Sequence, residues 1–195
     1  RCNLHCQYCQ NYDISQMDAG QEVEPDELAS IMLELQVNGC HNINFVSPTH
    51  VVAPILAAVL ITAQVGLHLP LVYNTGGYDS RPALQLLDGV VDIYMPDMKY
   101  ANDQIGLRYS KIRNYALVNR AAIKEMHRQV GDLQLDEQGL ATRGLLVRHL
   151  VLPHGLAGTD EIVRFLATEI STNSYLNLME QYHPAWLARQ YPKLT

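Results

Sequence analysis

The sequence lacks the features that mark several common classes of protein. No run of about 18 or more consecutive apolar residues is present, so no transmembrane helix is predicted and no membrane association is expected. Lys and Arg total 14 of the 195 residues against 20 Asp and Glu, and no basic stripe alternates with aromatic residues. Nucleic acid is therefore not an expected partner. The sequence also shows no signal peptide, no internal repeat and no low-complexity tract.

Cysteine is scarce, and its placement is uneven. Of the four cysteines, Cys2, Cys6 and Cys9 are clustered and Cys40 stands alone. A secreted disulfide scaffold has an even set of cysteines spread along the chain. Clustered thiols instead indicate metal binding or redox chemistry in a reducing compartment, so we expect a cytoplasmic protein. Cys40 follows a predicted helix end and is expected to be a small buried residue.

The length allows one sizeable hydrophobic core. With 195 residues and 48% hydrophobic content, we expect a single domain over residues 1–195. The first residue is Arg1 rather than Met, and residues 191–195 contain no natural stop signal. We therefore expect a fragment, truncated at the N-terminus and also at the C-terminus.

Helical stretches alternate with short β-rich runs along the chain. Caps, early prolines, acidic first turns and following glycines predict helices over residues 24–37, 51–65, 80–87, 115–130 and 159–170. Strands are predicted over residues 42–46, 69–74, 90–95, 145–152 and 175–179, with a small hairpin over 133–142. This alternation is typical of parallel βαβ units. We expect an α/β fold, a partial (β/α) barrel whose first strand is missing from this chain.

In such sheets, functional residues gather at the carboxyl ends of the strands. Polar residues follow several of the predicted strands, namely Ser47, Thr49, His50, Asn74, Thr75, Asp97, Lys99 and His183. These residues are the first candidates for a site.

The clustered cysteines have the spacing C-x3-C-x2-C. Three thiolates on one short loop reach three corners of a [4Fe–4S] cube and leave the fourth iron without a protein ligand, whereas closed electron-transfer clusters use four cysteines. The alternative is a zinc knuckle with Cys40, His5 or His41 as the fourth ligand. Structural zinc sites prefer paired C-x2-C units, and a second pair is absent from the sequence.

This motif, with an aromatic residue at Tyr8 before the last cysteine, resembles the signature of the radical S-adenosylmethionine superfamily. The run Cys9-Gln10-Asn11-Tyr12 is similar to the group related to pyruvate formate-lyase activating enzyme. Three further stretches resemble a largely uncharacterised branch of that group: residues 42–50, 73–78 and 92–100. The resemblance covers nearly the whole chain. It implies a (β/α)6 TIM-like barrel of the radical SAM type, a [4Fe–4S] cluster on Cys2, Cys6 and Cys9, and S-adenosylmethionine as the second cofactor.

The resemblance also implies an activity. Such an enzyme cleaves S-adenosylmethionine reductively to a 5′-deoxyadenosyl radical, and no catalytic residue beyond the cluster is expected. In activating enzymes the radical abstracts hydrogen from a backbone glycine, which makes a glycyl-radical enzyme the implied partner and flavodoxin or ferredoxin the implied electron donor. Two alternatives stay open: a radical enzyme acting on a small molecule, and a zinc or iron–sulfur module without catalysis.

Two charged positions match the family's Asp-x-Lys pair. Asp97 and Lys99 lie two residues apart, so in an extended segment they point the same way. The resemblance implies that Lys99 pairs with the carboxylate of the methionine moiety and that Asp97 orients Lys99 or a ribose hydroxyl. The alternative is a solvated ion pair. Arg148, on an apolar strand, is expected either to contact the cofactor or to form a salt bridge to an acid such as Asp97.

The remaining candidates depart from the family pattern. Asn74 stands where the family has Asp, and its amide oxygen is expected to contact the ammonium group of the cofactor, although the segment also fits an ordinary turn. Residues 47–50 replace the superfamily's Gly-Gly-Glu, so the backbone carbonyls of this segment and the Thr49 hydroxyl are the expected substitutes for its contact with the amino group. His183 occupies a place similar to a histidine near the adenosyl group. Tyr8 completes the predicted cofactor-binding set.

Overall fold

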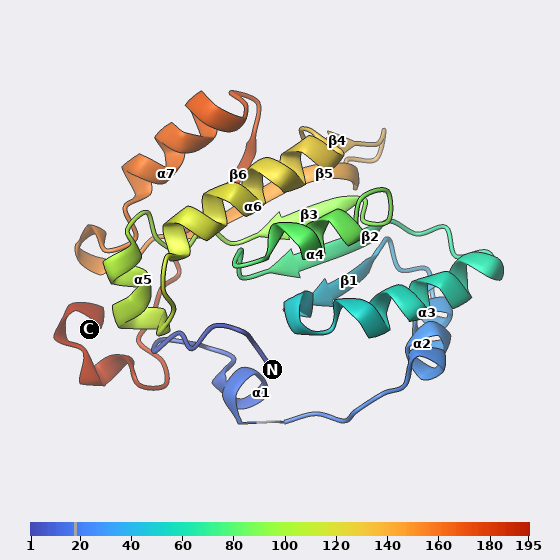
Figure 1. The fold of residues 1–195 in the computed structure, drawn as a ribbon, viewed down its shortest axis with the longest axis horizontal. Coiled ribbons are helices and arrows are strands. Elements are labelled where there is room, and N and C mark those ends of the chain that lie inside the picture. Colours follow the sequence, from blue (N-terminus) through green and yellow to red (C-terminus); the bar gives the residue numbers. More distant parts are fainter. Residues whose placement is uncertain (18) are drawn as a thin grey trace.

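The parallel sheet predicted from the sequence is present. The computed structural model describes residues 1–17 and 19–195. In this part of the chain, five strands pair in parallel in the order β1, β2, β3, β5, β6, and β4 pairs antiparallel with β5 (Figure 1). Their bounds are β1 Ile43–Val46, β2 Leu71–Thr75, β3 Ile93–Pro96, β4 Gln134–Leu135, β5 Ala141–Leu150 and β6 Tyr175–Met179. The architecture is an α/β fold consistent with a partial barrel.

The strands differ in how far they are covered. Every residue of β2 is buried, as expected for a central parallel strand that is covered on both faces. In β1, buried residues alternate with exposed ones, which is typical of a strand with one covered face. Val46, the last residue of β1, has a largely exposed side chain. The carboxyl ends of these strands face the N-terminal loop (Figure 1).

Helices α4 and α6 cover one face of the sheet, and α3 lies beside β1 (Figure 1). The Ser80 hydroxyl caps α4 by accepting a hydrogen bond from the backbone N–H of Ala83 at 3.3 Å. The helices span α1 Tyr12–Gln16, α2 Pro25–Val37, α3 Val52–Gln64, α4 Arg81–Leu86, α5 Asp103–Ser110, α6 Tyr115–Val130 and α7 Thr159–Phe165. None of the helices described is long and apolar enough to cross a bilayer.

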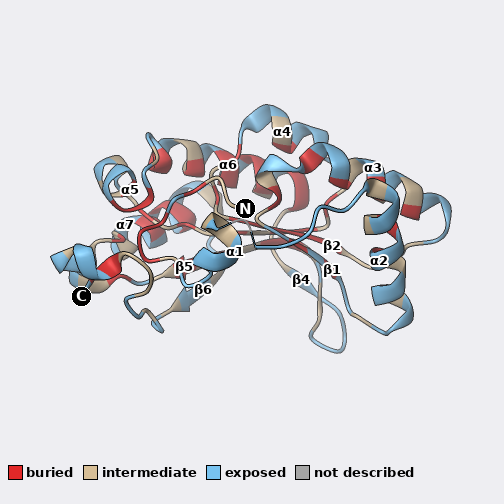
Figure 2. Cartoon of the chain, turned by 90° about the horizontal axis from the view of Figure 1, so that it is seen from below, coloured by how far each residue is buried: buried red, intermediate tan, exposed pale blue. Residues whose placement is uncertain are grey.

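Buried residues form separate clusters, and the position of one of them matters for function. The largest lies between the sheet and helices α4, α6 and α7, around residues such as Tyr94, Ile123 and Met126. A second cluster packs against the loop that carries Cys2, Cys6 and Cys9, called the cysteine loop from here on. This cluster is rich in tyrosine, and its Tyr100, Tyr109 and Tyr115 are each almost fully buried. Figure 2 shows buried residues in the strands and on the inner sides of the helices, with exposed outer sides. The cysteine loop is therefore part of the packed interior.

Most predicted elements are confirmed within a few residues, and the exceptions have identifiable causes. Helix α5 was missed, although Asn102 begins it by accepting hydrogen bonds from the N–H groups of Gln104 and Ile105. The short helix α1 was also missed. The strand predicted over residues 145–152 is longer at its start, because the hairpin with β4 continues directly into β5. The helix predicted over residues 159–170 ends as an α-helix at Phe165 and continues as a π-helical turn.

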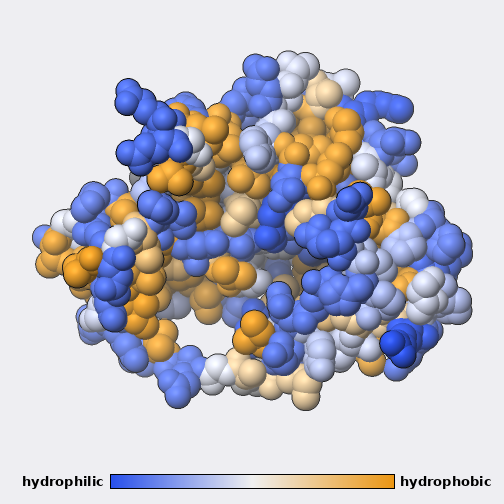
Figure 3. Space-filling model, turned by 180° about the vertical axis from the view of Figure 1, so that it is seen from behind, coloured by the Kyte–Doolittle hydropathy of each residue, from blue (hydrophilic) through white to orange (hydrophobic). Residues whose placement is uncertain are grey.

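Apolar side chains remain exposed on parts of the surface. Figure 3, which views the molecule from behind, shows groups of apolar side chains between polar ones on that face. The exposed large apolar residues include some on the outer strands, namely Val46, Tyr175 and Leu178.

One glycine is required where β2 ends and the chain turns past β3. Gly77 has φ +75°, and a Cβ atom there would lie 2.2 Å from the Asp97 carbonyl oxygen and 2.3 Å from Asn119 Nδ2. Gly89 has a similar φ of +78°, but a Cβ atom there would meet nothing within 4 Å. An alanine at Gly89 therefore introduces backbone strain alone, whereas an alanine at Gly77 introduces backbone strain and steric overlap.

We predict that Gly77→Ala lowers the free energy of unfolding much more than Gly89→Ala. Both changes carry about 1–2 kcal/mol for a left-handed L-residue, and Gly77→Ala adds about 1–3 kcal/mol of overpacking. Denaturant unfolding monitored by circular dichroism measures both variants. Equal losses would show that the close approach to Asp97 does not constrain the turn.

Candidate functional site

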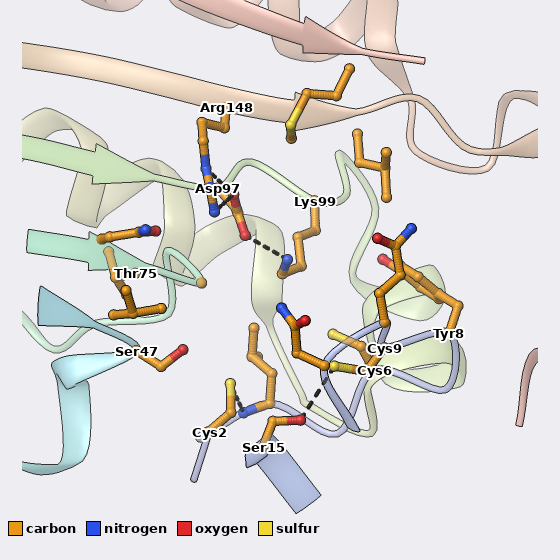
Figure 4. Close-up of a pocket in the computed structure, with 18 of the residues that line it drawn as sticks. Cys2, Cys6, Tyr8, Cys9, Ser15, Ser47, Thr75, Asp97, Lys99 and Arg148 are labelled. Carbon is orange, nitrogen blue, oxygen red and sulfur yellow. Dashed lines mark hydrogen bonds and ion pairs between the residues drawn. The ribbon is translucent and has the colours of Figure 1, made fainter. Parts of the chain in front are cut away.

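A cavity of about 250 Å³ lies at the carboxyl ends of the parallel strands. Its walls come from the cysteine loop and from the ends of β1, β2, β3, β5 and β6, so segments far apart in sequence meet there. Figure 4 shows side chains from these segments pointing into one space. Of the residues predicted from the sequence to hold the iron–sulfur cluster or bind the cofactor, the following line this cavity: Cys2, Cys6, Tyr8, Cys9, Asn74, Asp97, Lys99 and Arg148.

The cysteine loop is attached to the carboxyl end of α5. The N–H of His5 donates to the Ser110 carbonyl at 3.0 Å, and the N–H of Gln7 donates to the Tyr109 carbonyl at 2.7 Å. The last carbonyl groups of a helix have no partner within the helix, so they are available to accept these bonds. Leu4 is buried and approaches Gly76 so closely that a Cβ atom there would lie 2.5 Å from Leu4 Cδ1. The loop is thus held from two sides.

Each of the three clustered sulfurs has a hydrogen-bonding group beside it. The N–H of Leu4 donates to Cys2 Sγ at 3.4 Å. A serine hydroxyl lies beside each of the other two sulfurs: Ser110 Oγ is 3.0 Å from Cys6 Sγ, and Ser15 Oγ is 3.2 Å from Cys9 Sγ. Such groups stabilise sulfur in its anionic, metal-binding form. The donor set therefore fits the iron–sulfur cluster that the resemblance implies.

Cys6 is the most deeply buried of these three residues. Burial raises the pKa of its thiol to about 11, although the positive charge of Lys99 and the hydrogen bond with Ser110 act in the opposite direction. The apolar surroundings alone would keep this sulfur protonated. Bound iron removes that preference, because metal coordination requires the thiolate.

Cys40 lies apart from the cavity. It is half-buried just beyond the end of α2, so the prediction that it is a small buried residue is wrong. The two histidines considered as zinc ligands, His5 and His41, are both exposed. Among residues 1–17 and 19–195, no three His, Cys, Asp or Glu side chains are grouped closely enough to hold a single metal ion.

Asp97 connects the two basic residues of the cavity. Its carboxylate accepts a hydrogen bond from Lys99 Nζ at 2.6 Å and forms an ion pair with Arg148 Nη2 at 2.8 Å. The side chains of Asp97 and Lys99 are only 14% and 20% exposed. Burial by itself raises the pKa of Asp97, but the two cations outweigh it and hold that pKa below the ordinary value. Burial by itself lowers the pKa of Lys99, but Asp97, with smaller contributions from Cys6 and Tyr115, outweighs burial and holds that pKa above the ordinary value.

The group therefore carries one negative and two positive charges, which leaves net positive charge at the cavity wall. The Lys99 ammonium has three protons and donates one to Asp97, so further donors are left for an anionic ligand. This geometry shows the salt bridge to Asp97, which was one of the two alternatives for Arg148, and its contact with the cofactor stays a prediction. The same geometry excludes the alternative in which Asp97 and Lys99 form a solvated surface pair.

A second carboxylate supports the turn after β2, and it was missed from the sequence. Asp79 is buried and accepts hydrogen bonds from the hydroxyls of Thr49 (2.7 Å), Thr75 (2.7 Å) and Tyr73 (3.0 Å). Burial raises the pKa of Asp79, and the three hydroxyls partly offset this effect. Its only sequence signal is a carboxylate shortly after a strand rich in hydroxyl groups. Thr49 is therefore directed toward Asp79, and its predicted contact with the cofactor stays a prediction.

The other predicted residues divide into two groups. Asn74 is buried at the cavity wall, and Tyr8 lines the cavity while its hydroxyl bonds that of Tyr100 at 2.7 Å. His183 is exposed, contacts Gln10 through Nδ1 at 3.2 Å and is not among the lining residues.

Ser47, at the start of the segment that replaces Gly-Gly-Glu, has φ +54°, a conformation that favours glycine. Ser47 lines the cavity.

Comparison with known proteins places this geometry in context. Residues 1–154 match the Radical SAM superfamily. An uncharacterised protein of Methanocaldococcus jannaschii is 32% identical over 205 residues, an alignment that covers 100% of this chain and 55% of that protein.

Several solved structures share the fold. Native anSMEcpe with bound AdoMet (S-adenosylmethionine) aligns with a TM-score of 0.65 at 11% identity, covering 100% of this chain and 55% of that one. A radical SAM methyltransferase from Sphaerobacter thermophilus aligns with a TM-score of 0.60 at 15% identity, covering 91% and 52%. Native anSMEcpe with bound AdoMet and Cp18Cys peptide aligns with a TM-score of 0.57 at 12% identity, covering 99% and 54%. This chain thus spans about half the length of the proteins it matches.

We predict that Asp97→Asn lowers the free energy of unfolding by about 3–5 kcal/mol, because it leaves two poorly exposed cations without their counter-ion. The pKa of Asp97 is depressed in the folded state. The loss should therefore be complete above the unfolded Asp pKa of about 3.9 and should shrink as pH falls through the lower folded value. Urea unfolding at a series of pH values measures both the size and the pH dependence.

Glu169→Gln is the matched control. Lys124 Nζ and Glu169 Oε2 form an ion pair at the same 2.6 Å, but their side chains are 52% and 48% exposed. Exposed pairs contribute about 0–1 kcal/mol, so this change should have little effect. Similar losses in the two variants would contradict a structural role for the buried pair.

Proposed function

The chain belongs to the radical S-adenosylmethionine superfamily, and we propose that it cleaves S-adenosylmethionine reductively at a [4Fe–4S] cluster held by Cys2, Cys6 and Cys9. The cluster and S-adenosylmethionine are the cofactors of this superfamily. One observation supports the proposal above the others: the three cysteines of the motif line the same cavity as the buried Asp97, Lys99 and Arg148 group. The unpaired, clustered thiols favour a reducing cytoplasm for this activity.

Cys2, Cys6 and Cys9 would hold the cluster, which would supply the one electron needed to cleave S-adenosylmethionine reductively to methionine and a 5′-deoxyadenosyl radical. The chain itself binds and orients the cofactor and excludes water. In this proposal Lys99 donates to the methionine carboxylate, and Asp97 holds the Lys99 ammonium in place. Arg148 adds positive charge on the same side of the cavity. The side-chain oxygen of Asn74 accepts a hydrogen bond from the amino group.

We propose a backbone glycine of a partner protein as the hydrogen donor to the radical. The run Cys9-Gln10-Asn11-Tyr12 and the Asp97-x-Lys99 pair support this assignment, because both resemble the activating enzymes. A neighbour in fold, anSMEcpe, is described with AdoMet and a peptide bound, so the architecture is compatible with a polypeptide substrate. Flavodoxin or ferredoxin is the proposed electron donor.

The test is anaerobic reconstitution of the full chain with iron and sulfide, followed by measurement of 5′-deoxyadenosine formed from S-adenosylmethionine and dithionite. We predict that Cys6→Ala abolishes the product, because one iron loses its protein ligand. Cys40→Ala is the matched control and should leave the yield unchanged, since Cys40 lies outside the cavity. If Cys40→Ala loses the cluster as fully as Cys6→Ala, the three-ligand site is wrong.

The same assay separates the partner classes. With a glycyl-radical enzyme of the same genome added, the proposal expects a protein-based radical signal in electron paramagnetic resonance. Turnover of S-adenosylmethionine that responds to added small molecules, with no protein radical formed, would assign the enzyme to the small-molecule class. A protein that holds a metal but produces no 5′-deoxyadenosine would be a binding module.

Cofactor affinity tests the role of Lys99 separately. We predict that Lys99→Ala weakens S-adenosylmethionine binding by roughly ten- to a hundredfold, because a hydrogen bond to a charged group contributes about 1.5–3 kcal/mol. Cluster content should stay normal. Lys193→Ala, which removes an exposed lysine, is the control and should bind normally. Titration by the change in the cluster's paramagnetic resonance signal measures both, and equal affinities would remove Lys99 from the binding site.

A further inference from the structure

A chain of hydrogen bonds leads from the sulfur of Cys6 into the tyrosine-rich group of buried side chains that packs against the cysteine loop. Cys6 Sγ lies 3.0 Å from Ser110 Oγ, Ser110 Oγ lies 2.7 Å from Tyr100 Oη, and Tyr100 Oη lies 2.7 Å from Tyr8 Oη. All four residues are buried, with Tyr100 and Ser110 each 1% exposed. Water therefore has little access to replace any of these bonds.

The direction of donation follows from proton counting once Cys6 binds iron. A coordinated thiolate has no proton and accepts, so Ser110 must donate to Cys6. The single hydroxyl proton of Ser110 is then used, and Ser110 accepts from Tyr100. Tyr100 has used its own proton in turn and accepts from Tyr8. The three hydroxyls thus align, each donating toward the sulfur, and aligned hydrogen bonds polarise one another.

We propose that Ser110 is a positioning residue for the cluster, and that the chain from Tyr8 through Tyr100 to Ser110 raises the reduction potential of the cluster by donating to Cys6. This inference rests on the proposed function, because it requires Cys6 to be a cluster ligand. Reduction adds negative charge that is shared with the cysteine sulfurs. A hydrogen-bond donor to sulfur therefore stabilises the reduced state more than the oxidised one.

The position of Ser110 is set by the backbone and not by the serine side chain. Ser110 is the last residue of α5, and its carbonyl accepts from His5 in the cysteine loop. Removing its hydroxyl should leave the attachment of the loop intact. Ser15, the hydroxyl beside Cys9, is half-buried on the short helix α1, where water can take its place. Ser110 has no such substitute.

The experiment is a potentiometric titration of the reconstituted full chain without S-adenosylmethionine, followed by electron paramagnetic resonance. We expect Ser110→Ala to keep its iron content and to shift the midpoint to a more negative potential. At the midpoint of the unmutated protein, the ratio of oxidised to reduced cluster should rise about threefold, which corresponds to about 30 mV for one electron. Tyr100→Phe should shift the midpoint in the same direction by less, because Ser110 still donates.

Two controls separate the relay from general effects of mutation. Tyr94→Phe removes a buried tyrosine hydroxyl that donates to Gln129, in the hydrophobic cluster between the sheet and α6. Ser30→Ala removes an exposed hydroxyl on α2. Both should leave the midpoint unchanged. If Ser110→Ala fails to retain iron, Tyr100→Phe decides, and an unchanged midpoint there overturns the relay.

The outcomes also distinguish this inference from the proposed function. An unmutated protein that assembles no [4Fe–4S] cluster overturns both. An unmutated protein that assembles the cluster and produces 5′-deoxyadenosine, combined with an unchanged midpoint in Ser110→Ala, overturns the inference alone.

Discussion

The structure depends on Asp97, which bonds to three neighbouring elements, β2, β5 and α6, at the point where β3 leaves the sheet. Its N–H donates to the Thr75 carbonyl of β2, and its own carbonyl accepts from Tyr115 and Asn119 of α6. Its carboxylate binds Arg148 of β5 and Lys99 just beyond it. A single residue thus ties two neighbouring strands and the covering helix together, and it also positions two cations at the cavity.

This arrangement couples stability to function. The positive groups in the cavity are poorly hydrated, and each would be costly without the carboxylate between them. In the proposed function, the same ion pairs that hold β3 against β5 also keep Lys99 oriented for an anionic ligand. The turn at Gly77 belongs to this arrangement, because only a residue without a side chain fits against the Asp97 carbonyl.

The cysteine loop is held by a different kind of interaction. It has no strand or long helix of its own, so two of its N–H groups donate to the free carbonyls of α5, and its apolar contacts include several buried tyrosines. The loop is thereby placed over an interior that contains hydroxyl groups rather than aliphatic side chains alone. Sulfur atoms in such a position receive hydrogen bonds that water does not supply.

Sequence alone determined the parallel βαβ order, through periodicity and capping, and the cysteine motif, through its spacing, because these patterns act locally and can be recognised along the chain. The role of the Asp97–Lys99 pair was expected only from the resemblance, since its spacing by itself also fits a solvated ion pair. The ion pair of Arg148 with Asp97 was one of the two alternatives expected for Arg148, because an arginine on an apolar strand requires an acid. Helix α5 could also have been found, since Asn102 is an ordinary N-cap.

Tertiary structure decided the rest of the site. Ser110 lies 104 positions from Cys6, and nothing local distinguishes it from the other serines of the chain. Asp79 likewise gains one of its three hydroxyl donors from a distant segment, because η1 (Pro48–His50) brings Thr49 against it. The same packing directs Thr49 toward Asp79, leaves His183 exposed and leaves Cys40 half-buried. Long-range contacts are set by how helices and loops pack on the sheet, and packing depends on the shape of the whole interior rather than on any local pattern.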